Sequence, residues 1–178
     1  MRNTGKTEKG TGKIIRHAVV DSAYGPMLVA ASEDGICRLS FGEDEQDLRR
    51  HFPKAELRGR DAAFDALVAR IQAVVAGERD GADIPLDQHG TEFQHRVWAE
   101  LRAIPAGDTR SYRDIAERLG NPNATRAVGG ANGANGVAVL VPCHRVIAHD
   151  GKLGGYAYGA EMKRSLLARE GVTLASAG

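Results

Sequence analysis

Four consecutive residues, Pro142-Cys143-His144-Arg145, place a thiol, an imidazole and a guanidinium side by side in the sequence. Proline is favoured at the first position of a helix. If Pro142 begins even one helical turn, free backbone N–H groups and the helix dipole stabilise a thiolate at Cys143. A neighbouring histidine or arginine lowers the pKa of the thiol further. These are the ingredients of an activated nucleophile.

A structural role for the same cysteine is also open. Adjacent side chains of an extended segment point in opposite directions, so adjacency alone does not make His144 the base for Cys143. A cysteine after an apolar run is commonly a buried small hydrophobe, and Val137–Val141 (VAVLV) is such a run, most simply a buried strand. Both interpretations of Cys143 stand at this point.

A helix is predicted to begin after residue 90. Thr91, with Gln94 three residues later, forms a capping box. Pro105-Ala106-Gly107 then ends the helix. The apolar residues between these signals recur at helical spacing and form one face: Phe93, Val97, Trp98, Leu101 and Ile104.

Two short helices follow around a turn. Ser111 is a cap signal for a helix that runs to Leu119, and Gly120-Asn121-Pro122 breaks it. Asn123 is predicted to cap a further helix that runs to about Asn132. Two short helices around a glycine-containing turn are the outline of a helix-turn-helix.

The second of these helices has an unusual composition for a reader of DNA bases. It carries one arginine among small residues, where a major-groove helix carries several long polar side chains. Each glycine inside a helix costs about 0.5–1 kcal/mol relative to alanine. Small residues allow a close approach, and the composition leaves tight helix–helix packing and contact with a nucleic-acid backbone both open.

The first half predicts a small sheet with two helices and contains no catalytic constellation. Cys37 lies on a predicted strand and is expected to be buried and inert. The predicted elements are strands Ile14–Val20, Met27–Ala31 and Ile36–Phe41, helices Glu43–Phe52 and Asp61–Ala76, and a short strand Ile84–Leu86.

The polar, turn-rich segment Gly77–His89 is the predicted boundary between two domains. We expect a flexible tail at 1–13, an N-terminal α/β domain at 14–88, a C-terminal helix-turn-helix domain at 90–172 and a tail at 173–178. The fold class is therefore α+β, a three-stranded sheet with helices followed by a mostly helical domain.

The composition is that of a globular protein, with 42% hydrophobic and 26% charged residues. No apolar run approaches the roughly 20 residues of a membrane helix, and Met1–Lys13 lacks the apolar core of a signal peptide. Two cysteines cannot make a disulfide scaffold or a four-cysteine zinc site. We expect a monomer in the reducing cytoplasm, with no membrane partner and no metal.

The motifs of the second half together resemble the O6-alkylguanine-DNA alkyltransferase family. PCHRV is preceded by Asn135 and, further upstream, by SYRDIAERLGNPNATRAVGGA, and it is followed by GGYAYG and KRSLLAREG. These motifs stand in the family's order from Thr91 to Val172. The first half is compatible with the family's ribonuclease H-like N-terminal domain, and the chain as a whole is similar to the C-terminal module of bacterial adaptive-response alkyltransferases.

The resemblance implies a role for each residue of a catalytic group. Cys143 matches the alkyl acceptor, whose sulfur attacks the carbon attached to guanine O6. His144 matches the base that takes the thiol proton through a water, and Glu170 matches the carboxylate that orients the histidine, which is the logic of a catalytic triad. Asn135 matches the residue that braces the active-site turn.

The resemblance also implies how DNA is held. Tyr112 matches the tyrosine that rotates the target nucleotide, and Tyr156 matches the pocket rim. Arg126 matches the arginine that fills the vacated stack, since a base inside the stack must be flipped out before it can react. Ala127, Gly129 and Gly130 would let the helix lie close in the minor groove.

What the resemblance implies is direct-reversal DNA repair in one irreversible turnover per chain. The partner is double-stranded DNA that contains O6-alkylguanine, with O4-alkylthymine as a further candidate substrate. No cofactor is needed, because the damaged base is itself the alkyl donor.

Three other functions are weighed against repair. The first is recognition of alkylated DNA without repair, which relatives lacking the acceptor cysteine perform. The second is a cysteine hydrolase or transferase that acts on small molecules. The third is a helix-turn-helix regulator in which Cys143 has a structural role.

Overall fold

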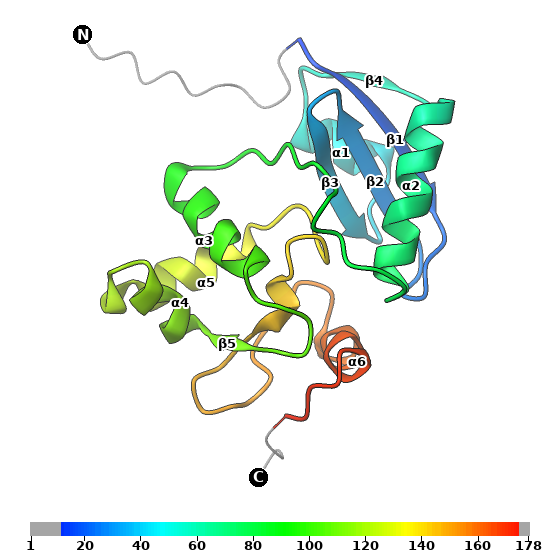
Figure 1. Cartoon of the computed structure of the whole chain (residues 1–178). Helices are drawn as coiled ribbons and strands as arrows, with labels where there is room; N and C mark the ends of the chain where they lie inside the picture. The colour runs from blue at the N-terminus through cyan, green and yellow to red at the C-terminus, as the bar shows by residue number, and fades with distance from the viewer. Residues whose placement is uncertain (1–11, 175–178) are drawn as a thin grey trace, which may run out of the picture.

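The computed structural model describes residues 12–174, so the tails expected at 1–13 and 173–178 lie almost entirely outside the described residues. The sheet and its two helices lie at one end of the molecule, and the remaining helices lie at the other (Figure 1). No helix in the described part of the chain is long and apolar enough to cross a membrane.

The first three strands form the predicted antiparallel meander. They are β1 (Ile14–Val20), β2 (Met27–Ser32) and β3 (Gly35–Phe41), and β2 lies between the other two. A fourth strand, β4 (Glu56–Arg58), pairs in parallel with β1 at the sheet edge, giving the order β3-β2-β1-β4. The expectation of three strands was short by this one, because three residues are too few to show an alternating pattern.

The two helices of the first half cover opposite faces of the sheet. Helix α2 (Ala62–Val75), capped by Asp61, places its apolar side in the larger hydrophobic core. Helix α1 (Glu45–His51), capped by Asp44, packs Leu48 into a second, smaller core on the other face. Burial raises the pKa of Cys37, in that smaller core, to about 12, so its thiol stays protonated at neutral pH, as expected of an inert cysteine.

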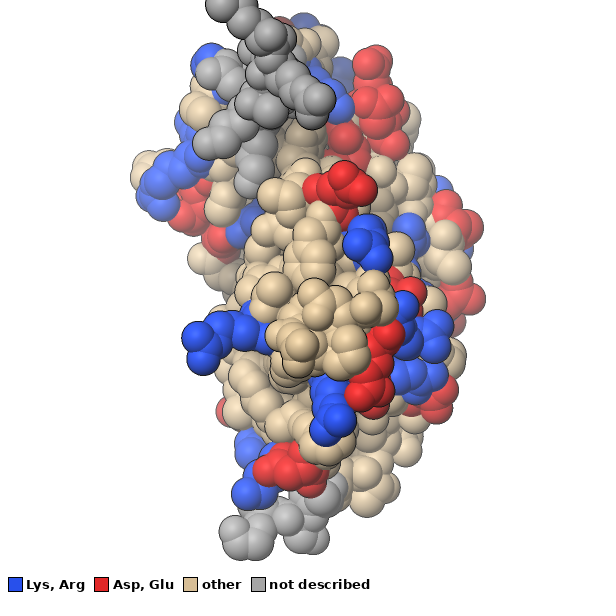
Figure 2. Space-filling view, turned by 90° about the vertical axis from the view of Figure 1, so that its left-hand side faces the viewer, with Lys and Arg blue, Asp and Glu red and all other residues tan. Residues whose placement is uncertain are grey.

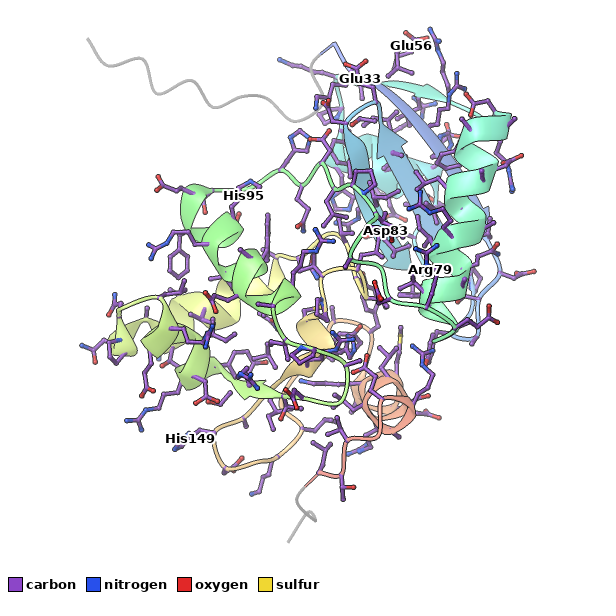
Figure 3. The ribbon with its side chains drawn as sticks, viewed as in Figure 1. Glu33, Glu56, Arg79, Asp83, His95 and His149 are labelled. Atoms are coloured by element: carbon purple, nitrogen blue, oxygen red, sulfur yellow. The ribbon has the colours of Figure 1, made fainter. Side chains whose placement is uncertain are left out.

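The segment after α2 runs back along the edge of β3. The predicted strand at 84–86 is reduced to a single bridge between Leu86 and Ile36. Gly35 has φ of +147°, and a Cβ there would stand 2.5 Å from the Pro85 carbonyl oxygen, so this close approach requires glycine. An ion pair of 2.6 Å joins Arg79 to Asp83 within the same segment (Figure 3).

The second half contains the predicted helix-turn-helix outline. Helix α3 (Glu92–Arg102) has the Thr91 capping box, and α4 (Tyr112–Arg118) is capped by Ser111. Helix α5 (Thr125–Gly133) follows a 3-10 turn, η1 (Pro122–Ala124). Helix α5 packs against both α3 and α4, and the Trp98 indole N–H donates to the Ala131 carbonyl oxygen at 2.9 Å.

The prediction that Asn123 caps this last helix was wrong. Asn123 lies inside the 3-10 turn, and its backbone N–H donates to the side chain of Asn121, which caps the turn. Helix α5 itself has no side-chain cap, because its first backbone groups continue directly from η1.

The apolar run Val137–Val141 is buried but is not a strand. Val139 has φ of +67°, and the backbone N–H of Val141 donates to the Val137 carbonyl oxygen at 3.1 Å, so the run folds back on itself. Its apolar composition correctly predicted that the run is buried, but burial does not specify an extended backbone.

The rest of the chain closes around this run. A short 3-10 turn, η2 (Cys143–Arg145), leads into β6 (Val146–Ile147), which pairs in parallel with β5 (Arg110–Ser111). Helix α6 (Ala160–Arg169) ends the described structure and contacts η2. The turn that carries Cys143 is therefore enclosed by elements from both ends of the second half.

Candidate active site

Cys143 begins the 3-10 turn η2, with Pro142 as its N-cap. The backbone N–H of Cys143 donates to the Val141 carbonyl oxygen at 2.7 Å, and the N–H of Arg145 donates to the Pro142 carbonyl oxygen at 3.0 Å. The helical turn expected from Pro142 is thus present. It is one short turn rather than the start of an α-helix.

Burial dominates the chemistry of the Cys143 thiol. The residue is 6% exposed, and burial raises the pKa of its thiol above the ordinary value. The Asn135 amide, the Lys163 ammonium and nearby backbone N–H groups lower that pKa, but by less than burial raises it. The expected net lowering is therefore not what the structure shows. The resting sulfur is a thiol, and it needs a base to become a nucleophile.

A histidine and a carboxylate lie next to this cysteine. His144 is fully buried, and its Nε2 lies 2.9 Å from Oε1 of Glu170, the C-cap residue that follows α6. The carboxylate can only accept, so Nε2 carries the proton and Nδ1 is left as the acceptor nitrogen. Nδ1 is buried and has no hydrogen-bond partner among the described residues.

The charge states favour a neutral histidine beside an ionised carboxylate. Burial lowers the pKa of His144, and the adjacent Glu170 only partly offsets this, so the imidazole is neutral at pH 7. Burial works to raise the pKa of Glu170, but hydrogen bonds from His144 and Arg145 outweigh it and bring the pKa to about 2. His144 can therefore accept a proton, and Glu170 stabilises the resulting cation.

Arg145 has a role in this group that the sequence did not identify: it was expected to lower the pKa of the Cys143 thiol, and it binds the Glu170 carboxylate instead. Its guanidinium donates to Glu170 twice, Nε to Oε2 at 3.0 Å and Nη2 to Oε1 at 2.7 Å, and donates Nη1 to the Ile104 carbonyl oxygen at 2.7 Å. A two-point contact of this kind holds a carboxylate in one orientation. The sequence contained a signal for this role, because Arg145 follows His144 directly in a tight turn.

Asn135 bridges the two ends of the folded apolar run. Its Nδ2 donates to the Val141 carbonyl oxygen at 2.9 Å, and its Oδ1 accepts from the Val137 backbone N–H at 3.0 Å. The side chain thus ties the approach to the cysteine turn at two points. That placement suits the bracing role that the sequence motif implies.

Both tyrosines predicted from the sequence lie within electrostatic reach of the sulfur. Burial raises the pKa of Tyr112, at the first position of α4, and the Cys143 charge adds to this shift. The same two causes raise the pKa of Tyr156 strongly. The Tyr156 hydroxyl is buried and has no hydrogen-bond partner among the described residues. It is therefore available to a molecule that enters beside Cys143.

Lys163 is a second residue that sequence reasoning missed. It is fully buried in α6, and its ammonium donates to the carbonyl oxygens of Val146 at 2.6 Å and Gly155 at 3.0 Å. Burial lowers its pKa to about 8. Lys163 lies three and four residues before the buried Leu166 and Leu167, and this helical spacing was the sequence signal that could have placed it on the buried side of the helix.

The remaining predicted residues lie on α5, apart from the cysteine turn. Arg126 and Ala127 are exposed, and Arg126 forms no hydrogen bond or ion pair with any described residue. A Cβ built at Gly130 would meet nothing within 4 Å, and one at Gly129 would meet only the Tyr112 ring, at 4.0 Å. Tight packing inside the molecule therefore does not explain these two glycines.

This side of the molecule presents a broad surface free of charged side chains, with basic and acidic groups around its margins (Figure 2). The two helices of the helix-turn-helix, α4 and α5, lie on the side of the molecule that faces the viewer in Figure 2. Among the described residues, no group of three or more His, Cys, Asp or Glu side chains is placed to hold a metal ion.

Two family models match consecutive parts of the chain. Residues 15–88 match the ribonuclease-like domain of 6-O-methylguanine DNA methyltransferase, and residues 92–172 match its DNA binding domain.

Individual relatives agree with these matches. The chain is 42% identical to the regulatory protein ada of Salmonella typhimurium, over 90% of the chain and 47% of the relative, so it spans about half the length of that protein. It is also 42% identical to a methylated-DNA–protein-cysteine methyltransferase of Methanosarcina acetivorans, over 87% of the chain and 97% of the relative. A crystal structure of Mycobacterium tuberculosis OGT in complex with DNA superposes with a TM-score of 0.74 and 43% identity, covering 88% of this chain and 92% of that one.

Proposed function

Because the chain belongs to the 6-O-methylguanine DNA methyltransferase family, we propose that it repairs O6-alkylguanine in duplex DNA by moving the alkyl group to its own Cys143. The observation that carries this proposal is the buried group of Cys143, His144 and Glu170 inside the segment that matches the family's DNA binding domain. A thiol that burial keeps protonated, beside a neutral histidine whose partner is an ionised carboxylate, suits a nucleophile that is activated only during reaction.

The chemical step is an in-line displacement at carbon. His144 takes the thiol proton through a water, and the sulfur attacks the alkyl carbon. The carbon–sulfur bond forms as the carbon–oxygen bond to guanine O6 breaks, and the guanine that leaves takes up one proton. Glu170, held by Arg145, stabilises the imidazolium that exists during transfer.

The base must first leave the helix. In the proposal, α5 lies in the minor groove, where Ala127, Gly129 and Gly130 allow a close approach and Arg126 fills the vacated stack. Tyr112 rotates the nucleotide and hydrogen-bonds the base, and Tyr156 lies at the rim of the pocket. Sparse contact with base edges suits a protein that must act at any sequence.

One chain completes one reaction in this proposal. A thioether is stable, so the alkylated Cys143 is not regenerated, and no cofactor is required. The reaction fits a monomer, with O4-alkylthymine as a further candidate substrate. A reducing compartment such as the cytoplasm keeps the acceptor thiol free. The sheet at 14–88 and the helices at 90–172 form the two proposed domains.

The experiment that tests the proposal is intact mass after incubation with a duplex containing one O6-methylguanine, followed by peptide mapping. The expected result is a gain of one methyl group per chain, on the peptide that holds Cys143. Methylation of another residue, or continued turnover, would contradict the assignment. A lesion that is bound but not repaired would favour the damage-recognition function instead.

A further inference from the structure

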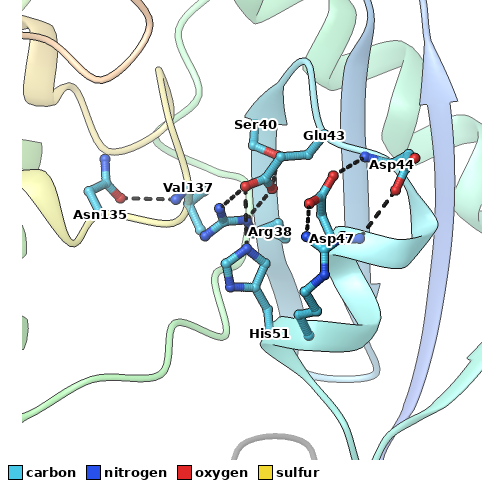
Figure 4. A network of polar contacts seen from close by, with 9 residues as sticks. Arg38, Ser40, Glu43, Asp44, Asp47, His51, Asn135 and Val137 are labelled. Atoms are coloured by element: carbon cyan, nitrogen blue, oxygen red, sulfur yellow. Dashed lines mark hydrogen bonds and ion pairs between the residues drawn. The ribbon is translucent and has the colours of Figure 1, made fainter.

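The first half of the chain holds the approach to Cys143 through its own backbone. The N–H of Leu39 on β3 donates to the Gly136 carbonyl oxygen at 3.0 Å, and the N–H of Ala138 donates to the Leu39 carbonyl oxygen at 2.9 Å. Figure 4 shows Asn135 and Val137 beside this strand. The start of the folded apolar run is therefore anchored to the sheet.

A side chain from the same strand lies against Gly136. The guanidinium of Arg38 is fixed by two hydrogen bonds to Glu43, of 2.9 and 2.6 Å (Figure 4). Its Nη1 stands 2.8 Å from the position that a Cβ on Gly136 would occupy. The glycine leaves room for this arginine. The contacts with Leu39 and Arg38 of β3 therefore hold the segment around Gly136 in one conformation.

The segment between the two halves adds a contact directly to the bracing asparagine. Nε2 of Gln88 lies 3.0 Å from Oδ1 of Asn135, across 47 positions of sequence. The backbone N–H of Val137 can only donate, so the Asn135 atom that faces it must be the oxygen. Gln88 then donates to the same oxygen, and the Asn135 nitrogen must point to the Val141 carbonyl oxygen. Gln88 and Val137 together determine which way the amide faces.

We propose that Gln88 is a positioning residue for the alkyl-transfer reaction: it holds the Asn135 amide in the orientation that the Cys143 turn needs. The segment joining the two halves thereby influences the reactivity of the sulfur. This inference rests on the proposed function only where it concerns alkyl transfer. Its effect on the thiol itself rests on the Val141 carbonyl oxygen, which accepts hydrogen bonds from both the Asn135 amide and the Cys143 N–H.

The influence reaches the sulfur through the Asn135 amide. Its Nδ2 donates to the Val141 carbonyl oxygen at 2.9 Å, and the Cys143 N–H donates to the same oxygen at 2.7 Å. The Asn135 amide also lowers the pKa of the Cys143 thiol, against the larger effect of burial. The ammonium of Lys163 on α6 also lowers the pKa of Cys143, and the charge of a Cys143 thiolate raises the pKa of Tyr112 on α4 and of Tyr156 and Tyr158 in the loop before α6. Among the described residues, none of these is hydrogen-bonded to Gln88. Changing Gln88 therefore isolates the contribution of the amide.

Two substitutions test this. Gln88→Leu removes the donor and leaves Asn135 Oδ1 with one partner. Gln88→Glu places a carboxylate against Oδ1 and favours rotation of the amide, which turns its oxygen toward the cysteine turn. The matched control is Gln72→Leu, because Gln72 lies in the first half and its Nε2 donates one hydrogen bond, to the Asp21 carbonyl oxygen at 3.2 Å.

The first readout is the rate of alkylation of Cys143 by iodoacetamide as a function of pH, with peptide mapping to separate it from Cys37. The second is the rate of reaction with free O6-benzylguanine at pH 7. Because one hydrogen bond contributes about 0.5–1.5 kcal/mol, we expect Gln88→Leu to slow both reactions roughly threefold to tenfold. Gln88→Glu is expected to slow them more, and the pH profile of both variants moves upward.

The inference is overturned if both Gln88 variants show the pH profile and rates of Gln72→Leu. It is also overturned if their rates fall in proportion to a lower melting temperature with an unmoved pH profile, because that pattern marks a purely structural contact. If the wild-type protein reacts with iodoacetamide but never takes up a methyl group from a duplex containing O6-methylguanine, the proposed function fails. The effect of Gln88 on the thiol is still read from the first assay.

Discussion

The imidazole Nε2 of His144 lies 2.9 Å from the carboxylate Oε1 of Glu170, although 26 positions separate the two residues in the sequence. His144 lies in the middle of the cysteine turn η2, and Glu170 is the C-cap of α6. The contact leaves the imidazole Nδ1 as the only acceptor of a ring that burial keeps neutral. The predictions below follow from this arrangement and from the surface of α5.

Replacing the acceptor sulfur separates binding from transfer. Cys143→Ser is expected to abolish transfer, because a buried hydroxyl is a far weaker nucleophile than a thiolate, while binding to alkylated DNA remains measurable. Intact mass and a gel-shift assay measure the two properties. Cys37→Ala, at the other cysteine, should keep full transfer. Transfer by Cys143→Ser would move the acceptor elsewhere.

Neutralising the carboxylate should change the pH dependence as well as the rate. Glu170→Gln removes the charge that stabilises the His144 cation, so transfer is expected to fall roughly 10-fold to 100-fold, given 1.5–3 kcal/mol for a hydrogen bond to a charged group. Glu170 raises the pKa of His144, so its loss lowers that pKa and moves the acid limb of the pH–rate profile to lower pH.

The matched control for that change is Glu161→Gln, an exposed carboxylate in the first turn of the same helix. Its rate and pH profile should equal those of the wild type. An acid limb that stays in place in Glu170→Gln would remove Glu170 from the proton-transfer group, whatever the rate.

The exposed arginine of α5 should matter only when a base has to leave the duplex. Arg126→Ala is expected to slow repair of duplex O6-methylguanine roughly tenfold or more, because flipping costs a few kcal/mol and the side chain offsets part of it. Reaction with free O6-benzylguanine should change less than about twofold. Arg164→Ala, an exposed arginine on α6, provides the comparison. Equal losses on both substrates would count against a stack-filling role.

Glu43 should make the stability of the fold sensitive to acid. Burial works to raise the pKa of this carboxyl, but hydrogen bonds from Arg38, Ser40 and His51 outweigh it and lower the pKa to about 2 (Figure 4). A folded-state pKa below the unfolded value stabilises the protein in full above pH 4.5, and the contribution disappears as the pH falls toward 2.

Glu43→Gln should therefore lower the free energy of unfolding at pH 7, by on the order of 3 kcal/mol at most, and by less as the pH falls toward 2. Urea denaturation at pH 7 and pH 3 measures this difference. Glu33→Gln, at an exposed carboxylate that forms no hydrogen bond with this cluster, should show no such trend. A loss that is the same at both pH values would show that packing, not charge, is responsible.

Local signals in the sequence predicted the helices well. Thr91 and Ser111 cap the helices that follow them, as predicted, and apolar spacing identified the buried sides of α2 and α3. These signals act over three or four residues, within one turn of helix, so a sequence contains all that is needed to see them. The strand β4 escaped because its pairing partner, not its composition, makes it a strand.

The sequence by itself therefore determined helices α1 to α5, the meander and the motif that carries the cysteine, whereas α6 was not among the predicted elements. Only the tertiary structure decided that Val137–Val141 folds back on itself, that Arg145 and Lys163 join the site, and that Gln88 reaches Asn135. It also decided that Cys143 is a protonated thiol. Polar neighbours lower the pKa of this thiol, but burial, which only the packed molecule imposes, raises it by more. Desolvation and hydrogen bonds between distant residues depend on which surfaces meet, and adjacency in the chain does not specify that.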